Sequence, residues 1–357
     1  MRSLTIALVS ALACLAQDAK TPARTATFEV RHELKVTLPE GAQKVRVWFA
    51  LPQEDPCSNI SEIKIDCPLR ARIETNADGI RMLYVEKEKP EGKEITIVET
   101  FTLTRTEQRG FPDPKKALPL SKEEQSKMAP CLAANQNVVI DEKIKKLADE
   151  IVGTETNPVV AARKIYDWVL ANIDYWVKDP NHKKASPVGS SEYCLAHKTG
   201  NCTDFHSLWT ALARAKGIPT RMVYGSFFKK ELDGQDKDQS YHCWPEFYAT
   251  GIGWIPHDVA VADLFVGDFE ITKDNDEKVR LTTADGYAGK DAAKVDYYFG
   301  NIDERRVVWS TGRDLTLAPA QEGGPVNALA KAHVEVDGKV LPEKTGWTRK
   351  LTYKEVK

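Results

Sequence analysis

The sequence predicts an α+β protein in which a helix packs on an antiparallel sheet, preceded by an all-β domain. Apolar residues alternate at every second position in several early segments, and no long helical period occurs before about residue 120. From residue 141 onward apolar residues recur at helical spacing, and strand-like runs follow the helices. The length of 357 residues suits two domains.

The composition indicates an ordinary globular protein. Hydrophobic residues make up 42% and charged residues 29% of the chain, which is enough to bury a real core. The formal net charge of −2 offers no electrostatic attraction for nucleic acid or for an anionic membrane surface. We therefore expect neither of these partners.

The first residues are typical of an export signal. A positive Met1-Arg2 precedes a mostly apolar run to Ala16, which is too short to span a bilayer. This pattern predicts a signal peptide over residues 1–16 and a periplasmic or secreted protein without a transmembrane segment. The Ala-Leu-Ala before Cys14 resembles a lipoprotein cleavage box, so lipid anchoring through Cys14 stays an alternative. An exported chain resides in an oxidising compartment, and Cys57 with Cys67 is the first candidate for a disulfide.

An all-β domain is expected over residues 24–108. Segments 25–38, 45–51, 82–85 and 95–103 alternate apolar with polar residues and are separated by turn signals. This pattern favours a β-sandwich, of immunoglobulin-like type.

A linker over 109–139 and a second domain over 140–322 follow. Asp141 can cap a first helix, and Asn157 followed by Pro158 can begin a second. Residues 323–357 read as a C-terminal β extension with a terminal hairpin.

A third helix carries the chemistry. Asn201 can cap it, and Gly217 ends it. Cys202 then lies in the first turn, where unpaired backbone N–H groups and the helix dipole stabilise a thiolate, the nucleophilic form. The same N–H groups can stabilise an oxyanion.

A cysteine nucleophile needs a base, and the base needs a group that orients it. His242 lies in an alternating, strand-like segment, and Asp258 follows the next strand-like segment, 254–255. If the two strands form a hairpin, both side chains can share one face. The sequence therefore predicts a Cys202, His242 and Asp258 triad.

Three blocks resemble the transglutaminase-like superfamily, over roughly residues 140–320. They are Gly200-Asn201-Cys202 with the segment LARAKGIPTR at 212–221, His242-Cys243-Trp244 with Glu246, and Gly253-Trp254-Ile255-Pro256 with Asp258. The resemblance implies a papain-like core, with Cys202 as nucleophile, His242 as general base and acid, and Asp258 as the group that orients His242. It implies acyl transfer through a thioester on protein or peptide amides, by cross-linking, deamidation or hydrolysis. The alternative is a catalytically silent binding or scaffold protein of the same fold.

Neighbouring residues are given lesser roles. His206 lies one helical turn after Cys202, and we expect a supporting position for it. His257 and Cys243 should point away from the site, because successive residues of a strand face opposite sides. Trp176 is a candidate oxyanion donor by position alone. No cofactor is expected and no metal, since Cys194 and His197 lack a second ligand pair.

Overall fold

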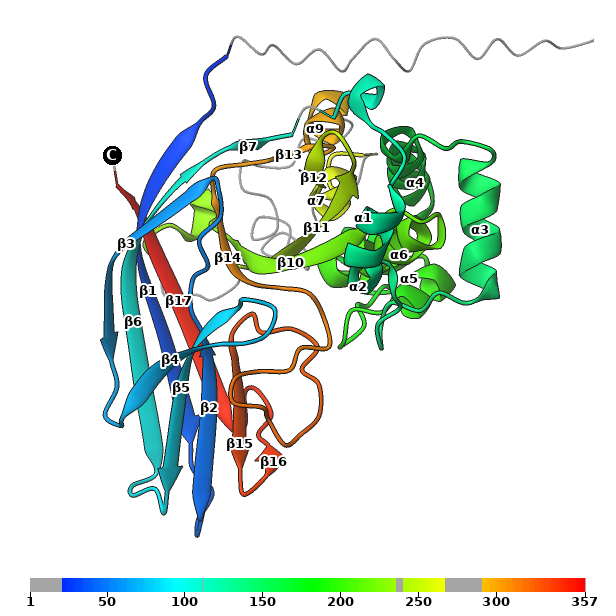
Figure 1. Cartoon of the computed structure of the whole chain (residues 1–357). Coiled ribbons are helices and arrows are strands. Elements are labelled where there is room, and N and C mark those ends of the chain that lie inside the picture. Colours follow the sequence, from blue (N-terminus) through cyan, green and yellow to red (C-terminus); the bar gives the residue numbers. More distant parts are fainter. Residues whose placement is uncertain (1–20, 111, 236–239, 267–290, 357) are drawn as a thin grey trace, which may run out of the picture.

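The computed structural model describes residues 21–110, 112–235, 240–266 and 291–356 (Figure 1). Long strands form one part of the molecule, and helices around a shorter sheet form the other. The predicted signal peptide, residues 1–16 with Cys14, lies outside the described residues. Within the described ranges, no helix combines the length and the apolar character needed to cross a membrane.

Two antiparallel sheets build the β part. One has the strand order β17-β1-β6-β3, and the other has the order β16-β15-β2-β5-β4. Their strands are β1 (Thr25–Thr37), β2 (Lys44–Ala50), β3 (Ser58–Asp66), β4 (Ala71–Thr75), β5 (Arg81–Glu88), β6 (Glu94–Thr106), β15 (Ala332–Val336), β16 (Lys339–Val340) and β17 (Trp347–Val356). The predicted strands at 25–38, 45–51, 82–85 and 95–103 correspond to β1, β2, β5 and β6 and are confirmed.

The two ends of the chain meet in these sheets. β17 pairs with β1 from Thr27 opposite Val356 to Val36 opposite Trp347. β15 pairs with β2 in the other sheet. The segment expected as a C-terminal β extension therefore supplies strands to the same two sheets as residues 25–106.

Alternation along β1 explains how the sheets share a core. Phe28, Val30, Leu34 and Val36 are buried, and so is His32 between them. Leu34 and Val36 belong to one apolar cluster with residues of β2, β5 and β15. An immunoglobulin-like topology is not confirmed, because the first two strands of that fold share one sheet whereas β1 and β2 lie in different sheets.

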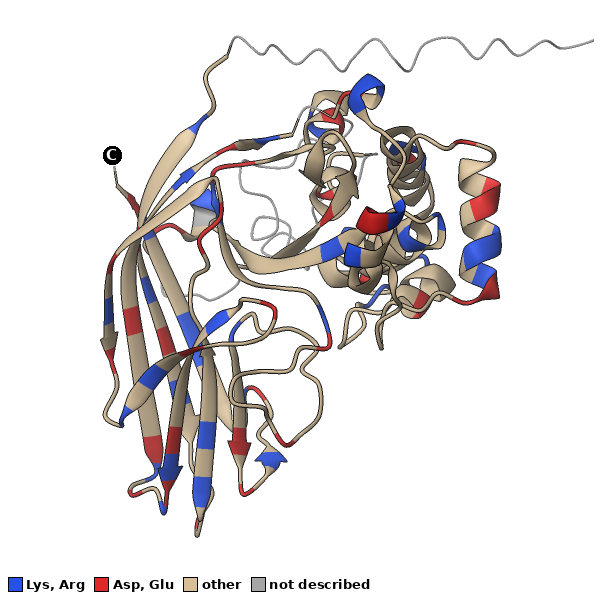
Figure 2. Cartoon of the chain, viewed as in Figure 1, with Lys and Arg blue, Asp and Glu red and all other residues tan. Residues whose placement is uncertain are grey.

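The described surface mixes both signs of charge. Figure 2 shows acidic and basic residues interspersed along the strands of the β part and on helix α3. The small net charge is thus spread over the molecule rather than separated into one acidic and one basic half.

A four-stranded sheet and several helices make the second part. The sheet has the order β12-β11-β10-β14 and is antiparallel throughout. The strands of this part are β8 (Asp174–Tyr175), β9 (Thr199–Gly200), β10 (Thr220–Phe227), β11 (Tyr241–Ala249), β12 (Gly253–Pro256), β13 (Asn301–Ile302) and β14 (Arg306–Thr311), and β7 (Gln108–Arg109) pairs with β13. The helices are α1 (Lys122–Lys127), α2 (Ala129–Leu132), α3 (Glu142–Val152), α4 (Pro158–Asn172), α5 (Ser191–His197), α6 (Cys202–Ala215), α7 (Val259–Asp263) and α9 (Ala292–Tyr297), with 3-10 turns η1 (Pro114–Lys116), η2 (Trp176–Lys178) and η3 (Lys230–Leu232).

The predicted helix starts are confirmed. The side chain of Asp141 accepts a hydrogen bond from the Ile144 amide at the start of α3. Asn157 accepts from the amides of Val159 and Val160 at the start of α4, with Pro158 as the first helical residue. The segment expected as a linker contains η1, α1 and α2.

Helix α6 is the centre of this part. Every residue from Cys202 to Arg214 is buried. The helix contacts α3, α4 and α5 and packs on β10 and β11 of the sheet. A helix packed on an antiparallel sheet, as the sequence predicts, is therefore confirmed.

Cys57 and Cys67 do not form the expected disulfide. They lie at opposite ends of strand β3 (Ser58–Asp66), and all six cysteines of the described residues are free thiols. A strand advances by about 3.3 Å per residue, so the two sulfurs are far too distant to bond.

Candidate active site

Cys202 is the first residue of α6, as predicted. The Asn201 side chain accepts hydrogen bonds from the amides of Thr203 and Asp204, and Asp204 in return accepts from the Asn201 amide at 2.9 Å. This reciprocal cap fixes the first turn and leaves the sulfur beside the positive end of the helix. Cys202 is only 3% exposed.

His242 and Asp258 lie together, although not on two strands. His242 is on β11, which forms the expected hairpin with β12. Asp258 follows β12 and caps α7, accepting a hydrogen bond from the Val261 amide at 3.0 Å. The His242 Nε2 is 2.6 Å from Asp258 Oδ2, so the carboxylate holds the ring and Nδ1 is left to face the thiol.

A buried arginine explains why the Asp258 carboxylate is ionised. Arg306 on β14 is fully buried and donates from Nη1 to Asp258 Oδ2 at 3.0 Å and from Nη2 to Asp303 at 2.7 Å. Burial alone would raise the pKa of Asp258. The charges of His242 and Arg306 outweigh burial and hold that pKa well below its ordinary value.

The thiol of Cys202 is ionised by its neighbours as well. A hydrogen bond with Cys243 is the largest cause that lowers its pKa, followed, against the opposing effect of burial, by the charge and hydrogen bond of His242. Burial acts to lower the pKa of His242, but the charges of Asp258 and Cys202 raise it overall. Both shifts favour a thiolate at Cys202 and an imidazolium at His242 over the neutral pair.

Cys243 does not point away from the site as expected. Its Sγ is 3.4 Å from the Thr203 Oγ1 and 3.5 Å from the His206 Nδ1, on the side of the sheet that α6 covers. The expectation that alternation removes Cys243 from the site was wrong, because the face of β11 that carries Cys243 packs against α6, the helix that carries Cys202. His257 does point away, with its ring 3.9 Å from that of Trp209.

His206 has the supporting position that was expected. It is fully buried, and its Nε2 is 3.4 Å from Asp258 Oδ1 while Nδ1 faces Cys243. Asp258 thus lies between two imidazole rings, and the shorter contact goes to His242.

Tyr175, rather than Trp176, contacts the amide of the nucleophile. The Cys202 backbone N–H donates to the Tyr175 hydroxyl at 3.2 Å. Burial first, and then the charge of Cys202, raise the pKa of Tyr175 well above its ordinary value, so the hydroxyl keeps its proton. Trp176 begins the adjacent turn η2.

A buried acid fixes Tyr175 in this place. The Tyr175 amide donates to Asp263 Oδ2 at 2.8 Å, and Lys178 lies 2.9 Å from the same oxygen. Burial raises the pKa of Asp263 to about 6, against the opposing charge of Lys178. Tyr175 and Cys202 are further brought together by the short parallel pairing of β8 with β9.

A hollow beside the nucleophile connects the two parts of the molecule. Its volume is ≈ 330 Å³, and its lining includes Thr203 and Tyr241 from the helical part and Lys331 and Trp347 from the C-terminal strands. The Tyr241 hydroxyl is 3.0 Å from Thr203 Oγ1, which places this hollow next to Cys202.

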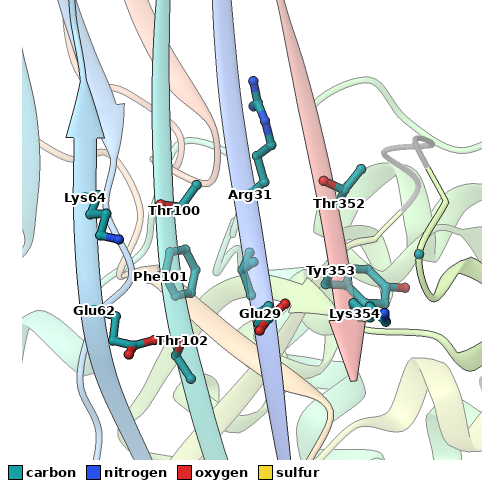
Figure 3. Close-up of a pocket in the computed structure, with 12 residues that line it drawn as sticks. Glu29, Arg31, Glu62, Lys64, Thr100, Phe101, Thr102, Thr352, Tyr353 and Lys354 are labelled. Carbon is teal, nitrogen blue, oxygen red and sulfur yellow. Dashed lines mark hydrogen bonds between the residues drawn. The ribbon is translucent and has the colours of Figure 1, made fainter. Parts of the chain in front are cut away.

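A second hollow has a different character. It has a volume of ≈ 510 Å³ and lies on the outer face of the sheet that contains β1, β3, β6 and β17 (Figure 3). Glu29 and Arg31 of β1 and Glu62 and Lys64 of β3 line it, together with threonines of β6 and β17. Cysteine and histidine are absent from its lining.

Sequence reasoning missed three neighbours of the triad, namely Tyr175, Cys243 and Arg306. Arg306 lies beyond the last of the three motif blocks, and Tyr175 reaches Cys202 through a two-residue strand pairing too short to leave a pattern. The alternation rule assigned Cys243 to the wrong environment. No pattern in the sequence marks Arg306, because its importance comes from its burial between Asp258 and Asp303 in the folded protein.

A family model matches the segment that contains the predicted triad. Residues 145–259 match the model of the transglutaminase-like superfamily, and the match contains Cys202, His242 and Asp258.

Relatives of the whole chain extend the comparison. An uncharacterized protein of Haemophilus influenzae is 27% identical over 88% of this chain and 87% of its own length. A candidate cysteine protease from Cytophaga hutchinsonii, known from its crystal structure, superposes over 94% of this chain and 93% of its own, with a TM-score of 0.58 at 16% identity. The periplasmic domain of TgpA from Pseudomonas aeruginosa aligns over 69% of this chain and 89% of its own, with a TM-score of 0.32 at 13% identity, which is too low to support a conclusion. The Cytophaga structure shares the fold over both parts of the molecule.

Proposed function

The chain contains a domain of the transglutaminase-like superfamily, and from this premise we propose that it is a cysteine-dependent acyltransferase or hydrolase that acts on protein or peptide amides. The observation that carries the proposal is the ion-paired group formed by Cys202, His242 and Asp258, with His242 Nε2 at 2.6 Å from Asp258. We further propose that the protein works outside the cytoplasm, on the strength of the apolar run that follows Met1-Arg2.

The first half of the reaction forms a thioester. The Cys202 thiolate attacks the carbonyl carbon of an amide, and His242 gives its Nδ1 proton to the departing ammonia or amine. Asp258 keeps the His242 ring in place through Nε2 and stabilises the positive charge of the ring until the proton is transferred.

The oxyanion that forms on the way needs hydrogen-bond donors. The Cys202 amide is one, because it lies at the start of α6. The Tyr175 hydroxyl, now 3.2 Å from that amide, can turn to donate to the same oxygen, since it keeps its proton at neutral pH. Substrate entry would replace the contact between the amide and the hydroxyl by two contacts with the oxyanion.

The second half resolves the thioester. Either water or an amine attacks its carbonyl carbon, and His242 takes a proton from the attacking group. Water gives hydrolysis or deamidation, and an amine gives a new amide bond. The hollow lined by Lys331 and Trp347 lies where the attacking group and the substrate chain would meet.

A thiol-labelling experiment tests the nucleophile. We expect iodoacetamide to label Cys202 at pH 6, where an ordinary thiol is almost entirely protonated. Cys194 is a matched control, because it is a buried cysteine of the same part whose pKa is raised by burial. Labelling of Cys202 no faster than that of a model thiol would remove the basis of the proposal.

A peptide library tests the reaction. The protein is incubated with the library, with and without a primary amine, and the products are read by mass spectrometry. Ammonia loss, amine incorporation and backbone cleavage give distinct masses, and Cys202→Ala should abolish whichever occurs while Cys194→Ser retains it. A reactive Cys202 without any turnover would favour the silent binding protein instead.

A further inference from the structure

Two cysteine side chains meet at the start of helix α6. The Thr203 hydroxyl is 3.9 Å from the Cys202 sulfur and 3.4 Å from the Cys243 sulfur. The same hydroxyl thus contacts both sulfurs, and Cys243 is the largest cause that lowers the pKa of Cys202. Cys202 comes from the helix and Cys243 from β11, so the contact joins the two elements that form the site.

The second thiol contacts a buried histidine. The His206 Nδ1 is 3.5 Å from the Cys243 sulfur, and Nε2 is 3.4 Å from Asp258 Oδ1. The Ala260 amide donates to Nε2 at 3.4 Å, so Nε2 is an acceptor and Nδ1 carries the ring proton and donates to the Cys243 sulfur. His206 therefore fixes the position of the Cys243 sulfur at the start of α6.

Acyl transfer makes no use of this second thiol as a nucleophile. A thiol beside an ionised cysteine is, however, the arrangement in which an oxidised cysteine is captured as a disulfide. We propose that Cys202 and Cys243 are a site of reversible oxidation. A hydroperoxide oxidises Cys202, and Cys243 then forms a disulfide with it.

Oxidation and capture take two steps. The Cys202 thiolate attacks one oxygen of hydrogen peroxide, the O–O bond breaks, Cys202 becomes a sulfenic acid, and the departing hydroxide takes the proton of His242 and leaves as water. The Cys243 thiol then attacks the Cys202 sulfur. The S–S bond forms, the S–O bond breaks, and the departing hydroxide takes the proton of Cys243 and leaves as a second water. Two thiols and one peroxide give one disulfide and two molecules of water, and a dithiol reductant restores both thiols.

The disulfide would protect the nucleophile. A sulfenic acid that meets no thiol is oxidised further to sulfinic and sulfonic acids, which a dithiol does not reduce. The same ionisation that makes Cys202 reactive toward amides exposes it to this loss. Capture by Cys243 keeps Cys202 in a disulfide that a dithiol can reduce, and so prevents its irreversible oxidation.

The test uses the whole purified protein, with and without hydrogen peroxide. After treatment, remaining thiols are alkylated, and the digest is searched for a peptide pair that joins Cys202 to Cys243. We expect this pair to be the main oxidised product, and we expect dithiothreitol to restore alkylation of Cys202 almost fully. Alkylation is the readout throughout, so the result does not depend on whether acyl transfer occurs.

Variants separate the proposal from simple sensitivity to oxidation. Cys243→Ser keeps a hydrogen-bonding group of similar size, and after peroxide its Cys202 should regain less than about a tenth of its alkylation with dithiothreitol, because sulfinic acid has formed. Cys194→Ser, a change of the same kind at another buried cysteine, should behave like the wild type. His206→Gln should slow closure of the disulfide, because it removes the ring that fixes the position of the Cys243 sulfur.

Two results would overturn the proposal. One is sulfinic acid at Cys202 accumulating equally fast in the wild type and in Cys243→Ser. The other is a Cys202 disulfide with Cys194 or Cys131 in place of Cys243.

Discussion

Two buried histidine–carboxylate pairs, one in each part of the molecule, differ in charge. His242 and Asp258 lie 2.6 Å apart beside the nucleophile, and His32 and Glu99 lie 3.4 Å apart between the sheets of the β part. Asp258 has a lowered pKa and His242 a raised one, so this pair is ionised. Burial raises the pKa of Glu99 to about 8 and lowers that of His32 well below its ordinary value, so this pair is neutral.

Neighbours, rather than burial, account for the difference. All four side chains are between 0% and 8% exposed. Arg306 donates to Asp258, and the Cys202 thiolate lies on the other side of His242. The ring of His32 instead lies between Phe49 and Trp309, at 4.1 and 4.6 Å.

The unused atoms show the same contrast. His32 Nε2 and Glu99 Oε1 find no hydrogen-bond partner among the described residues. Asp258 uses both carboxylate oxygens, with Val261 on one and His242 and Arg306 on the other. A buried histidine and acid therefore become a charged pair only where further donors and charges surround them.

The largest expected effect comes from converting each acid to its amide. Asp258→Asn should lower the acyl-transfer rate by roughly a thousand- to ten-thousandfold, because the amide no longer stabilises the charged ring. Glu99→Gln should leave that rate within about twofold, because its pair is neutral and lies in the other part. The measurement is kcat/KM on whichever peptide the library identifies.

Retained Cys202 alkylation at pH 6 in Asp258→Asn would contradict this view of the charged pair. Circular dichroism of both variants serves as the control for folding.

Removal of Arg306 should have the next largest effect. Arg306→Gln leaves the buried Asp303 without its cation and leaves Asp258 with His242 as its remaining cationic partner, which costs about 3–5 kcal/mol in the free energy of unfolding. Lys35→Gln is the comparison variant, since its ion pair with Glu94 is exposed and is worth less than about 1 kcal/mol. Urea unfolding measures both, and equal losses would show that burial does not distinguish the two pairs.

Glu99 should make stability depend on pH in a predictable direction. Its pKa is about 8 in the folded protein and 4.5 ordinarily, so between these values the folded state holds a proton that the unfolded chain releases. The stability that this group contributes is complete below pH 4.5 and is lost as the pH rises to about 8.

We therefore expect Glu99→Gln to be more stable than the wild type at pH 8.5 by on the order of 2–3 kcal/mol, and to show a flatter profile from about pH 7.5 upward, where His32 is almost entirely neutral in both states. Urea unfolding across this range is the measurement, with the exposed Glu94→Gln on the same strand as control. A parallel profile for Glu99→Gln and the wild type would mean that the pair is not neutral.

The sequence predicted the charged pair better than the neutral one. Motif order identified His242 and Asp258, because catalytic geometry requires fixed residue types at compatible spacing. His32 occupies a position where the alternation predicts an apolar residue. The residues around it do not indicate that Glu99 lies opposite it on β6. Such a contact depends on the register of two strands far apart in the chain.

The same reasoning explains the elements that were missed or misplaced. Alternation and caps located β1, β2, β6, α3, α4 and α6, which are long or strongly patterned. β17 was expected in a separate extension, because a strand's partner cannot be read from its own residues. Tyr175 was passed over for its neighbour Trp176, since only the pairing of β8 with β9 decides which of the two faces Cys202.

The smallest expected effect comes from Tyr175, the uncharged side chain beside the charged pair. It tests whether Tyr175 or Trp176 contacts the oxyanion. Tyr175→Phe removes the hydroxyl that contacts the Cys202 amide, and it should lower kcat by roughly ten- to a hundredfold with KM little changed, since the hydroxyl is needed mainly by the oxyanion. Iodoacetamide labelling of Cys202 should persist at pH 6, because the thiolate depends on Cys243 and His242. Trp176→Phe is the matched change at the neighbouring position and should lower kcat less. A larger loss in Trp176→Phe than in Tyr175→Phe would assign the oxyanion contact to the indole. The pairing of β8 with β9, which places Tyr175 beside Cys202, would then not determine the oxyanion donor.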